Sequence, residues 1–401
     1  IKMRSSVFQL NSSQRHFYPM GKGGNAYPSS RASYDNPPLE KEKPVNANMS
    51  MNKNADQSSV RTPKTRWYNR GGIQGISTVG MGISVVLVPL LFATSLSPAE
   101  EDVFFFSGYC SFTQVFVAVL CFNIVSAIFV HRMRSAFCVV CVPTYMASLL
   151  TLFTLQSPIL PTCAIILLAV AWRVGVCMSV CLHRYAAHGA FKCGPSVQFV
   201  LNLLGCAANQ GGPIWWASQH KCHHKYCDVK RDPHSALLVG TERAFSFFLK
   251  FSSVEEEFAP KHNDNWYLRL VDTWCFAVVW AEMLLAYKVF GRDGLFISYT
   301  SLWMCQTITL WFNVANHPVS IPKKCKAASY RVQPEQWYPA FQLLHLLHPL
   351  FATIVGEKDH DDHHKHSMLA KRGAADLAYY VSILPLHKLG LVWDVKQACS
   401  K

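Results

Sequence analysis

Histidines at helical spacing are the residues of this chain most able to do chemistry. Segments 220–224 and 360–364 each carry histidines at positions i, i+3 and i+4. Residues at this spacing share one face of a helix, so the three imidazoles of a segment can point at a single place. Imidazole is a ligand for iron, zinc and copper alike. A single such triplet more often lies on a solvated surface, but its repetition favours metal binding.

A histidine pair and a single histidine extend the pattern. His183 and His188 are five positions apart, about 140° around an α-helix, so they cannot share one face of a straight α-helix. We expect His183 to end a helix and His188 to follow where that helix opens, with ordinary interfacial histidines as the alternative. His317 ends another apolar segment, where it is either a ligand or a polar anchor.

The number of candidate ligands suits two metals better than one. One metal takes about four to six ligands, and a zinc site closed by four would need fewer histidines than this chain offers. Two irons with open positions for dioxygen fit the count, although ligand type excludes neither zinc nor copper. Nearby carboxylates could accept the second ring N–H of the ligands, namely Asp232, Asp359, Asp361 and Asp362. The nine candidate ligands are His183, His188, His220, His223, His224, His317, His360, His363 and His364.

The composition is that of a membrane protein. Half of the 401 residues are apolar and only 15% are charged. The loop 97–102 is acidic and the loop 131–134 is basic, which predicts cytosolic termini and places every histidine segment on the cytosolic side. Apolar stretches near the roughly 20 residues that a helix needs to cross a bilayer lie at 76–97, 103–130, 136–156, 160–182, 267–290 and 295–315.

The chain divides into a tail and a membrane domain. Residues 1–72 are basic and rich in Ser, Asn, Pro and Gly, so we expect a disordered tail, and 1–34 faintly resemble a transit peptide. Residues 73–401 form the predicted domain, in which 195–204 reads as an interfacial helix. The net charge of +14 does not indicate nucleic-acid binding, because no soluble basic module is visible. Fifteen cysteines without regular spacing indicate a reducing compartment.

Taken together, the histidine segments resemble those of the membrane fatty acyl desaturases of the stearoyl-CoA desaturase type, over about 161–396. The shared motifs are His-Arg-x-x-x-His from His183, His-x-x-His-His from His220 with the Asp-Pro-His that follows at 232–234, Asn-x-x-x-His from Asn313, and Gly-Glu at 356–357. Two features depart from the family. The stretches 76–97 and 103–130 are additional, and 320–350 lacks an Asp-x-Ser-x-Asn-Asn run.

The resemblance implies an all-α integral membrane fold. About four core transmembrane helices and an extra N-terminal hairpin would be capped by a cytosolic helical domain that carries a di-iron site. It also implies that the nine histidines bind two irons, that Asn313 holds a metal-bound water with Asp232 nearby, and that Trp216 and Thr309 line an acyl tunnel.

The implied enzyme is an oxidoreductase that uses dioxygen and two electrons to insert a cis double bond into a long-chain acyl group. A Δ9-type acyl-CoA desaturase is expected, with an acyl-lipid as the alternative substrate. Removing hydrogen from an unactivated methylene needs a metal-bound oxidant, and the electrons must come from outside. The chain has no fused haem-binding His-Pro-Gly-Gly motif. A cytochrome b5 with its reductase is therefore expected in the endoplasmic reticulum, or ferredoxin in a plastid.

Two other functions remain open at this stage. A fatty acid hydroxylase or acetylenase would share the scaffold and the metals. A polytopic metal transporter would be a different class, but it would place its ligands near mid-membrane, whereas these histidines lie at span ends and in cytosolic segments.

Overall fold

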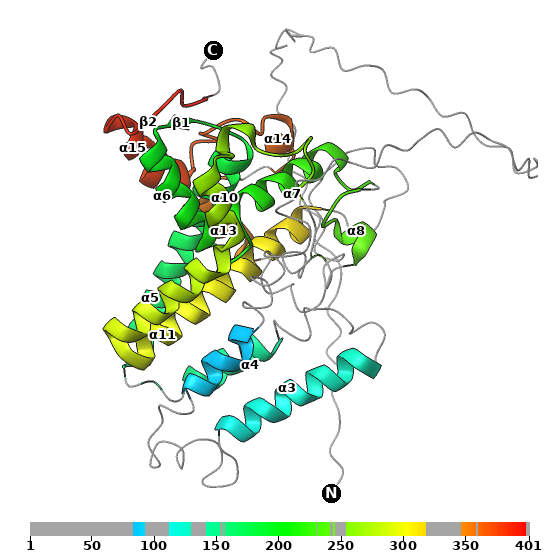
Figure 1. Cartoon of the computed structure of the whole chain (residues 1–401), viewed down its shortest axis with the longest axis vertical. Helices are drawn as coiled ribbons and strands as arrows, with labels where there is room; N and C mark the ends of the chain where they lie inside the picture. Colours follow the sequence, from blue (N-terminus) through cyan, green and yellow to red (C-terminus); the bar gives the residue numbers. More distant parts are fainter. Residues whose placement is uncertain are drawn as a thin grey trace, which may run out of the picture. The chain divides into compact units, whose positions relative to one another are not determined.

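The computed structural model describes residues 83–92, 112–129, 142–152, 155, 157–229, 231–240, 244, 254–317, 346–357 and 360–397. All of them belong to the unit Arg61–Lys401, and the unit Ile1–Val60 lies outside them, as does the whole predicted tail 1–72. The described residues are mostly helical, as predicted (Figure 1). A helix at Ile83–Phe92 is followed by α3 (Phe112–Phe129), α4 (Val142–Leu152), α5 (Ile159–Trp172), η4 (Arg173–Ala187), β1 (Lys192–Cys193), α6 (Pro195–Cys206), α7 (Pro213–Tyr226), α8 (Ala236–Val239), η6 (Lys261–Asn263), α10 (Trp266–Thr273), α11 (Cys275–Asn316), α13 (His348–Val355), α14 (His360–Lys365), η9 (Tyr379–Ile383), α15 (Leu384–Lys388) and β2 (Val392–Trp393).

The longest apolar helix joins α5 to the π-helix η4. Leu160, Leu167 and Leu168 of α5 are exposed, whereas every residue of η4 is buried. Among the described residues, this helix is the one whose length and composition suit a bilayer crossing, and the bent pair α10 and α11 would make a second if it counts as one span. The predicted span 160–182 lies within the first.

Helices α10 and α11 together cover two of the predicted spans, 267–290 and 295–315, and α11 folds back between them (Figure 1). Gly291 has φ 65° and ψ −150°, a conformation that L side chains avoid, so glycine permits the reversal here. The Ser298 hydroxyl then donates to Glu282 across the hairpin at 3.1 Å. Glu282 also pairs with Arg173 of η4, which ties the hairpin to the long helix.

The remaining apolar stretches also contain helices. The helix at Ile83–Phe92 lies within 76–97, α3 within 103–130 and α4 within 136–156. Phe92 packs edge-on against Phe296 of α11, with ring centroids 6.2 Å apart. Val117, Phe122 and Val125 of α3 are exposed, as expected of a helix whose apolar surface meets lipid.

The elements that carry the histidines gather at one end of this unit, near the short ribbon of β1 and β2 (Figure 1). The strands pair antiparallel, with Lys192 opposite Trp393. Helix α6 forms at the predicted 195–204. Helix α7 starts where the Asp272 carboxylate accepts the backbone N–H groups of Ile214 and Trp215 at 2.7 and 2.9 Å. This contact satisfies two of the four N–H groups that a helix start leaves unpaired, and it fixes where α7 points.

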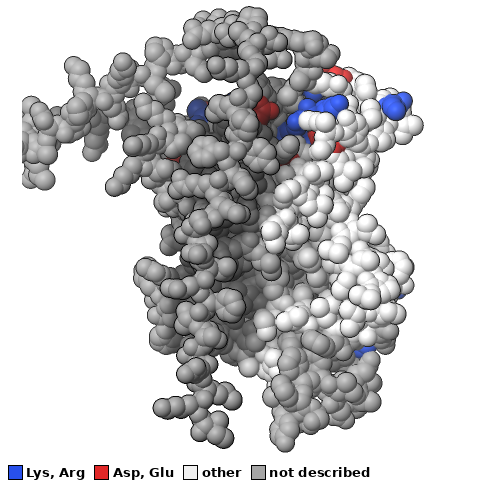
Figure 2. Space-filling view, turned by 180° about the vertical axis from the view of Figure 1, so that it is seen from behind, with Lys and Arg blue, Asp and Glu red and all other residues white. Residues whose placement is uncertain are grey.

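Charge follows the same division. In Figure 2, Lys and Arg side chains gather toward the end that carries the ribbon, while the described surface below them is nearly uncharged. An uncharged waist beneath a charged end is the distribution expected of a membrane-embedded domain.

Candidate metal centre

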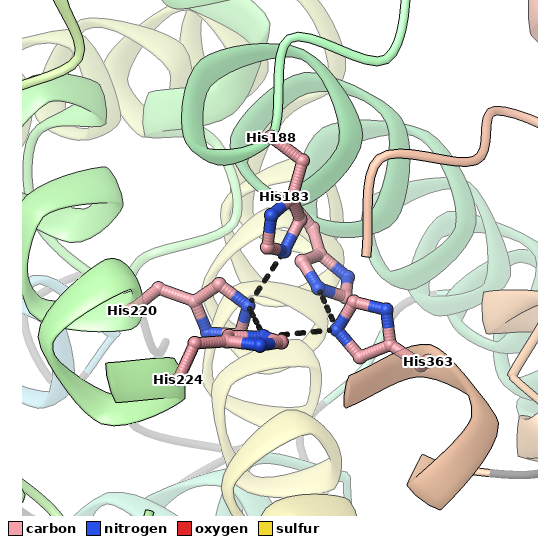
Figure 3. A group of neighbouring side chains, drawn as sticks. All are labelled: His183, His188, His220, His224 and His363. Atoms are coloured by element: carbon pink, nitrogen blue, oxygen red, sulfur yellow. Dashed lines mark hydrogen bonds between the residues drawn. The ribbon is translucent and has the colours of Figure 1, made fainter. Parts of the chain in front are cut away.

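The nine histidines meet, but in two clusters rather than one. In the first cluster, the ligand nitrogens lie within 4.8 Å of one another. Its closest Nε2 pairs are His183 with His363 at 2.9 Å, His188 with His220 at 3.0 Å, and His220 with His224 at 3.0 Å (Figure 3). The first cluster consists of His183, His188, His220, His224 and His363.

The second cluster contains the other four candidates within the same 4.8 Å limit. The Nε2 atom of His360 lies 2.9 Å from that of His317 and 3.2 Å from that of His364. The second cluster consists of His223, His317, His360 and His364.

Each histidine triplet is divided between the clusters. On α7, the i and i+4 residues His220 and His224 enter the first cluster, and the i+3 residue His223 enters the second. On α14 the assignment is reversed, because the i+3 residue His363 enters the first. The expectation that each triplet points at a single place was therefore wrong. A face spanned by i, i+3 and i+4 is wide enough for two neighbouring targets.

His183 and His188 share one cluster through a different backbone than we expected. η4 is a π-helix, and the His188 N–H donates to the His183 carbonyl five residues earlier at 3.2 Å. Bonding between i and i+5 brings the fifth residue back over the first. The predicted opening of the helix between them was wrong, since the 140° separation applies only to an α-helix.

Carboxylates orient four of the nine rings. The Nδ1–H of His223 donates to Asp232 at 2.8 Å, and that of His317 donates to Asp228 at 2.9 Å. Glu357 accepts from both clusters, from His183 at 2.8 Å and from His360 at 3.1 Å. A proton held on Nδ1 leaves the Nε2 lone pair free for a metal.

Glu357 is itself held in place by basic residues. It is buried and pairs with Arg372, whose side chain is only 5% exposed. Burial would raise its pKa, but the hydrogen bond from His183 and the charge of Arg372 hold the pKa well below its usual range. Arg184, beside His183, donates to the Val355 carbonyl at 2.8 Å and so fixes the backbone just before Glu357.

The protonation state of the rings suits metal binding. Burial lowers the pKa of His188, His220, His223 and His224 well below the usual value, and it also lowers the pKa of the three α14 histidines. The rings are therefore neutral and offer lone pairs. Among the described residues, the buried Nε2 of His223 has no hydrogen-bond partner. Converging lone pairs in a buried space are unfavourable unless a cation binds them, so these residues fit a pair of metal ions.

A small cavity of about 50 Å³ adjoins both clusters and contains the remaining predicted site residues. Trp216 and Thr309 line it, and Trp216 stacks on His220 with ring centroids 4.8 Å apart. Asn313 also lines it, where its Nδ2 lies 3.0 Å from Nδ1 of His234.

The sequence interpretation missed several of these contacts. Asp228 and Arg372 were not among the candidates, and His234 and Glu357 were noted only as parts of motifs. Of the proposed carboxylates, Asp232 contacts a ligand, while Asp362 is exposed and lies 3.9 Å from His366 instead. Asp359 and the side chain of Asp361 lie outside the described residues.

Known proteins confirm the predicted resemblance. No protein-family model matches the chain. It is 28% identical to an acyl-CoA 5-desaturase of Anemone leveillei over 231 residues, which make up 53% of this chain and 65% of that protein. A stretch of 58 residues is 48% identical to a hex-5-enoyl-(acyl-carrier protein) acetylenase of Moorena producens, covering 14% of this chain and 18% of the relative. Over 64 residues the chain is 42% identical to the chloroplastic palmitoyl-monogalactosyldiacylglycerol delta-7 desaturase of Arabidopsis thaliana, covering 16% and 17% of the two proteins.

The chain thus spans less than two thirds of the length of each of these relatives. They are desaturases and an acetylenase of fatty acyl groups, and the chain resembles the fatty acyl desaturase family.

Proposed function

We propose that this chain is a fatty acyl desaturase that binds two irons in its two histidine clusters. The observation that carries the proposal is the division of nine histidines into groups of five and four beside one cavity. A bound iron pair supplies the dioxygen chemistry that an unactivated methylene requires. Imidazole is a good ligand for iron. The nine histidines of the two clusters are more ligands than one closed zinc site needs.

The protein's own part is to position the acyl chain and to exclude water from the site. Trp216, Thr309, Leu310 and Phe312 line the cavity beside both clusters and would hold the acyl chain there. Position decides which carbon–carbon bond reacts, because the metals are fixed by their ligands. Asn313 and His234 supply the polar wall of the same cavity, where Asn313 would hold a water on a metal.

The finer assignments belong to this proposal. The substrate is a long-chain acyl-CoA, with Δ9 as the expected position, and the electron donor is cytochrome b5 with its reductase. Residues 73–401 form the membrane domain of a multi-pass protein of the endoplasmic reticulum, with the metals on the cytosolic face. The second assignment is a plastid membrane, with ferredoxin as the electron donor and a glycerolipid as the substrate. It is favoured by the relatives that are chloroplastic.

One experiment tests the function. The chain is expressed in a desaturase-deficient host, total fatty acids are profiled by mass spectrometry, and the purified protein is assayed for metal content. We expect new cis-monounsaturated acyl chains and two irons per chain. Oxygen added to the acyl chain would identify a hydroxylase instead.

The second candidate function is that of an acetylenase, because a relative with that name is 48% identical over its matched segment. The same profiling separates the two, since a triple bond lowers the product mass by two further hydrogens. Metal accumulation in the cells without any lipid change would favour the transporter.

A further inference from the structure

A second, larger cavity touches only the first cluster. It has a volume of about 700 Å³, and His188 and His224 form part of its wall. The small cavity beside Trp216 includes neither of these two histidines. The first cluster is therefore approached from two sides, one of which no part of the acyl-chain proposal uses.

The large cavity is basic. Lys192, Lys221 and Lys396 line it, and none of its described lining residues is acidic. Asp394, outside the lining, pairs with Lys192 at 2.9 Å, which leaves a net charge of +2 from these four residues (three lysines less one aspartate). Lys396 donates to the Gly189 carbonyl at 2.9 Å, so its ammonium is held close to the cavity without a carboxylate.

Lys221 lies on α7 between two histidine positions and is the most informative of the three. Its side chain is partly buried, and no acidic partner contacts it among the described residues. An anionic group that enters the cavity would supply the partner that this ammonium lacks among the described residues.

The wall of the cavity includes exposed apolar side chains. Trp393 is 48% exposed and Met368 is 51% exposed, and both line the cavity. Aromatic residues and methionine are enriched in protein interfaces, and flanking charges steer the encounter of two proteins. Lys192, Cys193 and Trp393 of the β1 and β2 ribbon line the cavity, at the end where Figure 2 shows charged side chains of both signs.

We propose that this basic cavity, lined by Lys192, Lys221, Lys396 and Trp393, is the docking surface of an acidic one-electron carrier protein that reduces the metal centre past His188 and His224. The inference rests on the proposed function, which requires two electrons from outside. Two carrier molecules in turn are each oxidised by one electron, and the two irons together go from ferric to ferrous. The acyl chain occupies the other cavity, so substrate and carrier approach the first cluster from different sides.

The test uses the full-length, iron-loaded protein in nanodiscs and two reduced carriers, the haem domain of cytochrome b5 and a plant-type ferredoxin. Stopped-flow absorbance follows oxidation of the carrier. We expect the second-order rate constant to fall steeply with salt, and to fall about tenfold in Lys192→Glu/Lys221→Glu. Lys221→Gln, which removes a charge without adding repulsion, should give a smaller fall. Reduction by dithionite should be unchanged in all variants.

Lys288→Glu is the matched control, because Lys288 is exposed on α11 near the hairpin turn and far along that helix from His317. Iron content is measured for every variant, since Lys221 adjoins two ligands. The docking surface would be overturned if the iron-replete Lys221→Gln variant and the iron-replete double variant were reduced by the carriers as fast as the wild-type protein. That result would not contradict the proposed desaturase function. Absence of product from the dithionite-reduced, iron-loaded wild type would overturn the proposed function and this inference with it.

Discussion

The two histidine clusters are held in different ways. In the second cluster, three of the four rings donate Nδ1–H to carboxylates, namely to Asp228, Asp232 and Glu357. In the first cluster, among the described residues, only His183 does so, and it shares Glu357. The first cluster has a fifth imidazole instead. A cation in the second cluster therefore meets more negative charge, and a cation in the first meets more neutral ligands.

The surroundings of the clusters differ in the same sense. His188 and His224 of the first cluster reach the wall of an open basic cavity. No histidine of the second cluster lines that cavity. We infer that the second cluster would bind a metal more tightly, and that the first would be the one to exchange electrons with a partner. Among the described residues, Glu357 is the carboxylate that contacts rings of both clusters, so a change at one cluster should reach the other through it.

Removing a ligand should have the largest effect. His363→Ala takes a ring from the first cluster and His223→Ala takes one from the second. We expect each to abolish the unsaturated product, while the protein remains in the membrane and loses about one of its two metals. Fatty acid profiling and metal analysis of the purified protein check this. His366→Ala, at an exposed histidine outside both clusters, is the control. Full activity in either variant would remove that residue from the metal site.

Glu357→Gln should affect both sites at once. The amide cannot accept two Nδ1–H bonds as a carboxylate does, and it leaves Arg372 buried without its ion pair. Loss of such a supporting contact typically costs about 10- to 100-fold in metal affinity. Chelator competition should therefore show weaker binding of both metals. Glu255→Gln, which breaks only an exposed pair with Arg231, should leave both affinities unchanged. A change at one site alone would show that Glu357 does not link the clusters.

Asp228→Asn should affect the second site only. Asp228 has φ 58°, a conformation that asparagine also tolerates, so the backbone is retained. The carboxylate that orients His317 is lost, and we expect about a 10-fold weaker second metal with an unchanged first. Metal titration followed by Mössbauer spectroscopy of the iron-loaded protein separates the two sites. Equal weakening of both would contradict the assignment of His317 to one cluster.

Much of this fold was readable from the apolar stretches. Each of the six contains a helix, and the break between the last two falls at Gly291, where a glycine lies between 290 and 295. The π-helical conformation of η4 could not be predicted from the sequence. Helices α6 and α7 from later in the chain both pack against η4, and no residue type between Arg173 and Ala187 marks a π-helix.

The nine converging histidines were also predictable, because residue type and spacing identify them. Their division into two clusters was not, since it depends on how α7 and α14 face each other. The supporting carboxylates were harder still. The proposed carboxylates were sequence neighbours of the histidines. Glu357, however, accepts a hydrogen bond from His183 of a distant segment, and Asp228 accepts one from His317. Such pairs are set by tertiary contact and leave no local pattern.

The smallest effect is expected in the cavity that both clusters share. Thr309 lines this cavity, and its hydroxyl is already bonded to the Cys305 carbonyl at 2.9 Å. Thr309→Leu would fill space there without removing a ligand. A difference of one methylene in an apolar pocket is worth about 1–3 kcal/mol, so we expect the preferred acyl chain to become shorter while total turnover falls about tenfold or less. Thr307→Leu is a close control, because Thr307 makes the same bond to its own helix, at 3.0 Å to Trp303, but does not line the cavity. The measurement is the chain-length distribution of the unsaturated products.

If both variants gave the wild-type distribution, the acyl chain would have to lie elsewhere. The basic cavity beside the first cluster would then be the space left for it, and the division of the two approaches between substrate and electron carrier would fail.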